Sequence, residues 1–123
     1  MSLAHLTLPT SAVERTARFL EQTLGCTRDA APANSPVETV WLSIGDGQQF
    51  HIVYVEGFEV SRFEGEFGRH VAIFQPAQEI AALKERLLAA GANPMQPLRP
   101  GAHERFFFRE PVNGYVFEVI AQR

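Results

Sequence analysis

Four residues of this sequence have side chains of the types that can bind metal ions, and they lie in segments where bulky apolar residues are the rule. They are His5, His51, His70 and Glu118, and each falls in a segment expected to form a strand. Alternate residues of a strand share a face, so Glu118 lies with Val116 and Ile120. If that face is buried, the carboxylate needs a partner; if the strand is half exposed, Val116 and Ile120 could be its wet side.

A divalent cation is one partner that suits this set of side chains. It holds a carboxylate ionised and accepts neutral imidazole nitrogens, so Fe(II), Mn(II), Co(II), Ni(II) and Zn(II) all fit. The alternative without a metal is that each histidine is an ordinary strand residue, either half-exposed or with its hydrogen bonds made within the protein, and that Glu118 lies on a solvated edge. Glu56, which ends the segment VYVEG, competes with His51 as the fourth ligand.

The segments that must position these residues occur in the same order in both halves of the chain. Each half is expected to hold a strand, a helix and about three further strands. Ser11 and Glu14 resemble a capping box at the start of the first helix, and Gly25 and Gly91 are natural helix ends. The clearest segments are 3–8, 11–25, 39–45 and 48–55 in the first half, and 69–74, 78–91, 105–110 and 115–121 in the second.

Matching offsets indicate that the two halves are copies of one module. A glutamate follows the first histidine of each half by nine residues, and the second candidate ligand follows a glycine by four. The pairs are His5 with Glu14, His70 with Glu79, Gly47 with His51, and Gly114 with Glu118. The separations from His5 to His51 and from His70 to Glu118 differ by two residues, which a short loop insertion explains.

Composition excludes several classes of protein. The chain of 123 residues has a formal charge of −3 and no run of Lys or Arg, so nothing points to nucleic acid or a membrane surface. No apolar stretch approaches the ~20 residues that span a bilayer, and the N-terminus lacks the features of a secretory signal. The single Cys26 forms no internal disulfide. We therefore expect one cytoplasmic domain.

The sequence resembles the vicinal oxygen chelate superfamily, of the glyoxalase, bleomycin-resistance and extradiol dioxygenase type. The likeness lies in residues 5–25, 41–53, 68–74 and 106–120, where Glu110-Pro111-Val112-Asn113-Gly114 stands for the Asp-Pro-Asp-Gly turn of the family. It implies an α+β fold of two strand-helix-three-strand modules, with a mixed β-sheet cupped around one metal ion. The modules are expected at about 1–57 and 68–123, joined by a linker at 58–67, and the assembly as a homodimer.

The resemblance also assigns the metal ligands. His5, His70 and Glu118 match the three most regular ligands of the family, and His51 matches the fourth position, which is a glutamate in typical glyoxalase I enzymes. In those enzymes a ligand carboxylate acts as the base. Glu118 and His51 are therefore the expected catalytic residues, with one divalent metal ion per site.

The function expected from the resemblance is a metal-dependent reaction of lyase or dioxygenase type on a small molecule with vicinal oxygens. Arg105, Tyr54 and Trp41 are the expected substrate contacts, although core or dimer packing is the ordinary use of the two aromatic residues. One alternative is a metal-free drug- or metabolite-binding protein of the bleomycin-resistance type. Another is a fosfomycin-type thiol transferase, for which Arg69, Arg99, Arg105 and Arg109 are the available cations.

Overall fold

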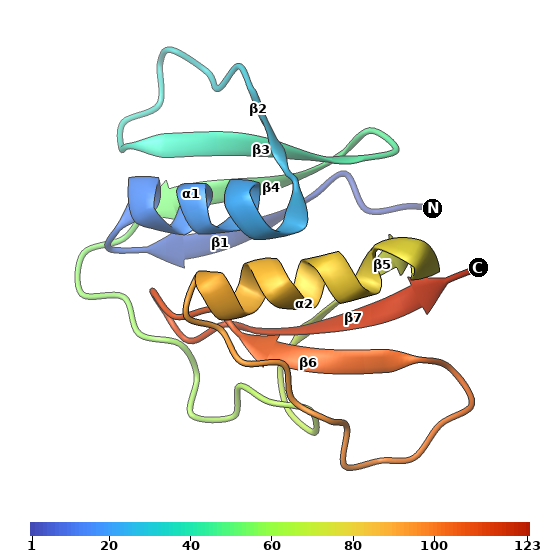
Figure 1. Ribbon diagram of the computed structural model, residues 1–123. Coiled ribbons are helices and arrows are strands. Elements are labelled where there is room, and N and C mark those ends of the chain that lie inside the picture. Colours follow the sequence, from blue (N-terminus) through green and yellow to red (C-terminus); the bar gives the residue numbers. More distant parts are fainter. The chain divides into compact units, whose positions relative to one another are not determined.

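The computed structural model describes all 123 residues and contains two compact units, Met1–Glu59 and Val60–Arg123 (Figure 1). The first unit forms one mixed sheet in the order β1-β4-β3-β2. β1 and β4 are parallel, and the other neighbours are antiparallel. Its elements are β1 (His5–Thr10), α1 (Val13–Leu24), β2 (Thr27–Asp29), β3 (Thr39–Gly45) and β4 (Gln48–Tyr54).

The second unit repeats this plan with one strand reduced. Its sheet has the order β5-β7-β6, parallel between β5 and β7 and antiparallel between β6 and β7. In the place of β2 there is a single antiparallel bridge from Met95 to Phe107. The elements are β5 (Val71–Pro76), the 3-10 turn η1 (Ala77–Glu79), α2 (Ile80–Ala89), β6 (Arg105–Arg109) and β7 (Val116–Gln122). The α+β fold with two repeated modules is confirmed, and the second module ends with two strands and a bridge.

Strand register shows that the two units are equivalent residue by residue. His51 pairs with Thr7 across the parallel ladder, and Glu118 pairs with Ala72. Thr7 and Ala72 each lie two residues after the first histidine of their unit, although His70 itself lies just before β5. The sequence offsets therefore identified the true structural equivalents.

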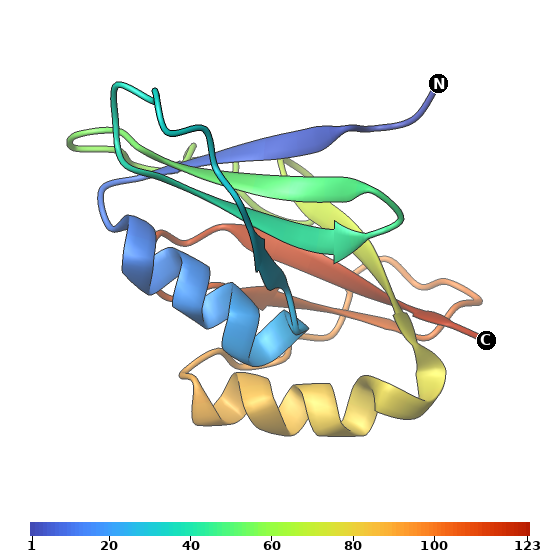
Figure 2. The same ribbon diagram turned by 90° about the horizontal axis from the view of Figure 1, so that it is seen from above.

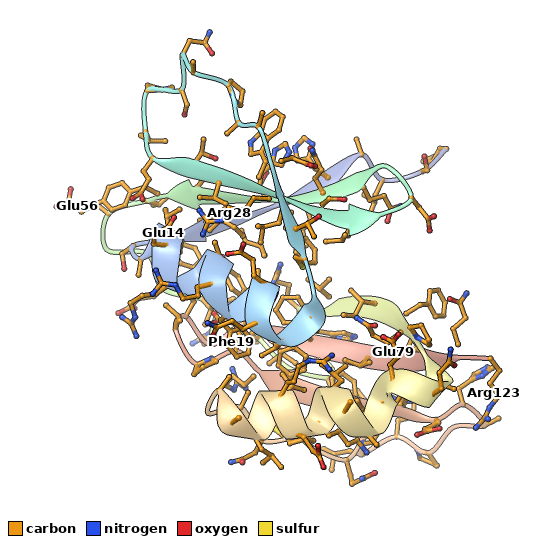
Figure 3. All side chains as sticks on the ribbon, turned by 45° about the horizontal axis from the view of Figure 1, so that its top comes forward. Glu14, Phe19, Arg28, Glu56, Glu79 and Arg123 are labelled. Carbon is orange, nitrogen blue, oxygen red and sulfur yellow. The ribbon has the colours of Figure 1, made fainter.

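Helix α1 packs on its own sheet through an apolar stripe. Val13, Ala17 and Leu20 are buried, and the helix contacts β3 and β4 (Figures 1 and 2). The expected capping box is wrong, because the N-cap residue is Ala12 and no side chain caps the helix. Glu14 instead accepts two hydrogen bonds from the Arg28 guanidinium, at 2.7 and 2.9 Å, which ties the start of α1 to β2 (Figure 3).

Helix α2 packs on one face of β6 and β7, and the candidate ligand Glu118 faces the other way. Ile80, Leu83 and Leu87 form the buried stripe of the helix, and the Lys84 ammonium lies 5.0 Å from the centre of the Phe106 ring. Alternate strand residues face opposite sides, so Glu118 lies on the face away from Phe106. Neither helix of the protein is long and apolar enough to span a membrane.

Candidate functional site

The first unit stacks three rings from adjacent strands. The His51 ring on β4 lies between the His5 ring on β1 and the Trp41 ring on β3, with centroid distances of 3.8 and 3.9 Å. Trp41 is the direct antiparallel neighbour of His51. Register therefore accounts for the contact of Trp41 with His51. The stack places two of the predicted ligands, His5 and His51, side by side.

Hydrogen bonds in the first unit fix the proton on His51. The Gln49 amide nitrogen donates to the Asp29 carboxylate at 2.8 Å, so the Gln49 amide oxygen faces His51. That oxygen accepts a hydrogen bond from Nε2 of His51, also at 2.8 Å. In the neutral ring the lone pair is then on Nδ1.

Burial keeps His51 in its neutral form. The residue is 8% exposed, and this desolvation lowers the pKa of His51 below its ordinary value of 6.5; the neighbouring His5 adds to the effect. A metal ligand must be deprotonated, so the fold supplies this imidazole in the form that binds metal.

The second unit brings His70 and Glu118 together. Nδ1 of His70 donates to the Gly65 carbonyl oxygen at 3.1 Å, and Nε2 lies 3.3 Å from Oε1 of Glu118. A neutral His70 with its proton on Nδ1 turns the Nε2 lone pair toward carboxylate lone pairs. Such a pair of acceptors requires a shared cation, either a proton or a metal ion.

Glu118 stands on a buried face and is already paired with a cation. Val116 is 1% exposed and Glu118 is 8% exposed, so the half-exposed alternative for this strand is wrong. Nη1 of Arg105 donates to Oε2 of Glu118 at 3.1 Å. A buried carboxylate needs such a partner, and the guanidinium and the imidazole share this one.

Some of the other predicted site residues lie beside the predicted metal ligands, and others do not. Trp41 and Arg105 lie beside predicted ligands, whereas Tyr54 ends β4 three residues from His51 and so lies on the opposite face of the strand. Glu56 is exposed beyond β4 and points outward (Figure 3). Neither unit by itself gathers three metal-binding side chains, because each supplies two of the four predicted ligands.

Two of the available arginines have structural partners. Nη1 of Arg69 lies 2.8 Å from a carboxylate oxygen of Glu64, and Nη1 of Arg109 donates to the Gly114 carbonyl oxygen at 2.8 Å. The same Glu64 oxygen accepts the Val116 backbone N–H at 2.8 Å, which ties residues 60–67 to β7. Arg105 is therefore the arginine that the fold places on a candidate ligand.

Sequence reasoning missed the residues that orient the candidate ligands. Gln49 shares the strand face of His51, and that spacing was a usable signal. Asp29 and the Gly65 carbonyl act from segments far away in the chain. Glu66 accepts backbone hydrogen bonds from Leu98 and Arg99, at 2.8 and 3.0 Å, across more than thirty residues of sequence, and no local pattern marks it.

Comparison with known proteins gives one family and one fold. The family model described as "Glyoxalase/Bleomycin resistance protein/Dioxygenase superfamily" matches residues 2–119. No curated protein matches the sequence.

Three solved structures illustrate the likeness in fold. The E126Q mutant of the fosfomycin resistance protein FosX from Listeria monocytogenes, complexed with Mn(II) and 1S,2S-dihydroxypropylphosphonic acid, has a TM-score of 0.78 at 20% identity, covering 99% of this chain and 92% of that one. FosX from Mesorhizobium loti gives 0.75 at 22% identity, over 99% and 92%. A possible glyoxalase from Bacillus cereus gives 0.73 at 21% identity, over 98% and 99%.

Proposed function

The chain belongs to the glyoxalase/bleomycin resistance protein/dioxygenase superfamily, and from this premise we propose that it is a divalent-metal-dependent enzyme acting on a small molecule with vicinal oxygens. The metal ligands that we propose are His5, His51, His70 and Glu118. Mn(II) is the first metal to test, because a FosX structure similar in fold contains it.

One observation carries this proposal. The Gly65 carbonyl accepts a hydrogen bond from His70 and so orients Nε2 of His70 toward Oε1 of Glu118, at 3.3 Å. A metal ion needs such neighbouring lone-pair donors, each held in place by a further hydrogen bond. His51 adds a buried imidazole whose lowered pKa keeps it neutral. The donor set of imidazoles and one carboxylate suits the borderline metals from Mn(II) to Zn(II).

The metal ion and the surrounding side chains would have different roles in the reaction. A metal ion held by these residues would supply Lewis acidity toward the substrate. Glu118 is the group proposed to take or return a proton, at Oε2, the oxygen that accepts from Arg105 in the metal-free chain. His51 can serve as the second base only where its Nδ1 lone pair is not bound to the metal ion. Trp41 and Phe107, the direct cross-strand neighbours of these two residues, shield them from water.

A fosfomycin-type reaction is the second candidate. The observation that favours it is Arg105, a cation in contact with Glu118 and suited to a phosphonate. The metal-free binding alternative makes the opposite prediction about metal, and it predicts that replacing the candidate metal ligands leaves the binding of the small molecule unchanged. We further propose that the enzyme is a homodimer.

Metal analysis tests the proposal. We expect bound metal in gently purified protein, and Mn(II) binding by calorimetry after chelation and reconstitution. Glu118→Gln keeps the shape of the side chain but removes the charge, and should weaken Mn(II) binding by at least ~100-fold with the fold intact. Glu85→Gln, an exposed residue of α2, is the matched control and should bind as the parent does.

Two results would contradict the proposal. One is less than ~0.1 metal ion per chain, unchanged by reconstitution, which favours the metal-free binder. The other is undiminished Mn(II) affinity in Glu118→Gln, which would remove this residue from the ligand set.

A further inference from the structure

A cavity of about 350 Å³ opens in the second unit, beside the loop that leads into β6. Its size lies within the range of small-molecule sites, roughly 300–1,000 Å³. Polar side chains dominate its wall, namely Lys84, Gln96, Arg99, His103, Glu104 and Arg105.

The charges of the cavity favour an anion. Three of its side chains are cationic, and its one carboxylate, Glu104, pairs with Arg123 at 3.4 Å. Lys84 contacts only an aromatic ring, and Nη1 of Arg99 donates weakly to the Pro100 carbonyl at 3.4 Å. Cations gathered in a concave site attract oxyanions, even in a chain with a net charge of −3.

Arg105 connects this cavity to the candidate ligand Glu118. Its Nη1 donates to Glu118 at 3.1 Å, while its Nη2 donates to the Arg99 carbonyl of the cavity loop. Nη2 also lies 3.9 Å from Glu66, which binds the Leu98 and Arg99 amides of that loop. The Arg105 side chain is only 6% exposed, so this guanidinium is shared between a few fixed partners.

We propose that the cavity binds an oxyanion group of the substrate, a phosphate, phosphonate, sulfate or carboxylate, and that Arg105 couples this binding to metal binding at Glu118. An oxyanion in the cavity draws the guanidinium away from Glu118. The released carboxylate then binds a metal ion more tightly. By linkage, occupancy of Glu118 by metal must strengthen oxyanion binding by the same factor. The inference rests on the proposed function in taking Glu118 as a metal ligand.

Calorimetric titration of the full chain with Mn(II), with and without sulfate at constant ionic strength, measures the coupling. We expect saturating sulfate to tighten Mn(II) binding by about tenfold. Arg105→Gln should bind Mn(II) about tenfold more tightly than the parent without sulfate, because the competing cation is gone, and sulfate should no longer change that affinity. Its metal-free form should melt at a lower temperature, since Glu118 loses a buried partner.

Two further variants separate coupling from a general charge effect. Arg99→Gln removes a cation of the same cavity that does not touch Glu118, so it should weaken sulfate binding and leave Mn(II) affinity in chloride within about twofold. Arg105→Lys retains a cation and should keep part of the coupling. Coupling that persists undiminished in Arg105→Gln, with sulfate acting directly on the metal, would overturn the proposal.

A measurement without metal keeps this inference distinct from the proposed function. In metal-free Glu118→Gln, Arg105 has lost its carboxylate partner, so sulfate should bind more tightly than to the metal-free parent. Unchanged sulfate affinity there would overturn the coupling even if Glu118 proves to be a metal ligand. If Glu118→Gln binds sulfate more tightly but binds Mn(II) as the parent does, only the role of Glu118 as a metal ligand would be contradicted.

Discussion

The two units share a backbone register but differ in the charge of their candidate ligands. In the first unit His51 lies between two rings and hydrogen-bonds to an uncharged amide. In the second unit the equivalent residue, Glu118, contacts an imidazole and a guanidinium. The shared register therefore sets the positions of the side chains, and the residue type at each position sets its electrostatics.

The strand register also identifies a second difference between the units, which accompanies the difference in charge between Glu118 and His51. Arg105 pairs with Ile120, two residues after Glu118, and Thr39 pairs with Val53, two residues after His51. Thr39 is thus the first-unit counterpart of Arg105, and its hydroxyl is buried without a hydrogen-bond partner. The unit with the carboxylate has a cation at this position, and the unit with the neutral imidazole has none.

The largest expected difference between the units concerns the aromatic neighbours of the two ligand positions. Phe107 is 3% exposed, so Phe107→Ala should lower the free energy of unfolding by about 3–5 kcal/mol. Trp41, its counterpart, is only half-buried, and Trp41→Ala should cost roughly 1–2 kcal/mol. Urea denaturation of the two variants measures the difference, and equal losses would show that the ring stack of the first unit is as tightly packed as the second core.

Exchanging the chemistry of the units should have an intermediate effect. His51→Glu places a carboxylate at a buried position that lacks a cation, and should destabilise the metal-free protein by about 1–3 kcal/mol. Adding Thr39→Arg recreates the arrangement of the second unit and should recover about 1 kcal/mol. Thr39→Arg alone is the control. If the double variant is no more stable than His51→Glu, register alone does not explain the pairing of Glu118 with Arg105.

Most of the fold could be predicted because its signals are local or periodic. The strand at 39–45 has the bounds that its apolar run and the following Gly-Asp-Gly turn indicated. The strand β2 was not identified, since Thr27–Asp29 is short, polar and exposed and owes its existence to pairing with β3. The capping box failed for a similar reason, because a distant Arg28 competes for Glu14.

The candidate site was predictable in its residue positions but less so in its contacts. Repeat offsets placed the two candidates of each unit, and the structure brings each pair together. The partners of those residues depend on side-chain geometry that no spacing encodes. Arg105 was expected to contact substrate, whereas in the structure its first partner is Glu118.

The smallest expected effect concerns proton binding by His51. Burial lowers the pKa of His51 in the folded chain, whereas the unfolded chain has the ordinary value of 6.5. The unfolded state therefore binds this proton more readily, so the stabilisation is complete above pH 6.5 and is lost as the pH falls from there through the folded pKa. NMR titration of the metal-free protein should give a midpoint for His51 below 6.5. Trp41→Ala exposes the ring and should move that midpoint toward 6.5, and His51→Gln should make the acid loss of stability shallower. A midpoint at or above 6.5 would mean that the stack does not exclude water from His51, and the first unit would then resemble the second in holding a charged group.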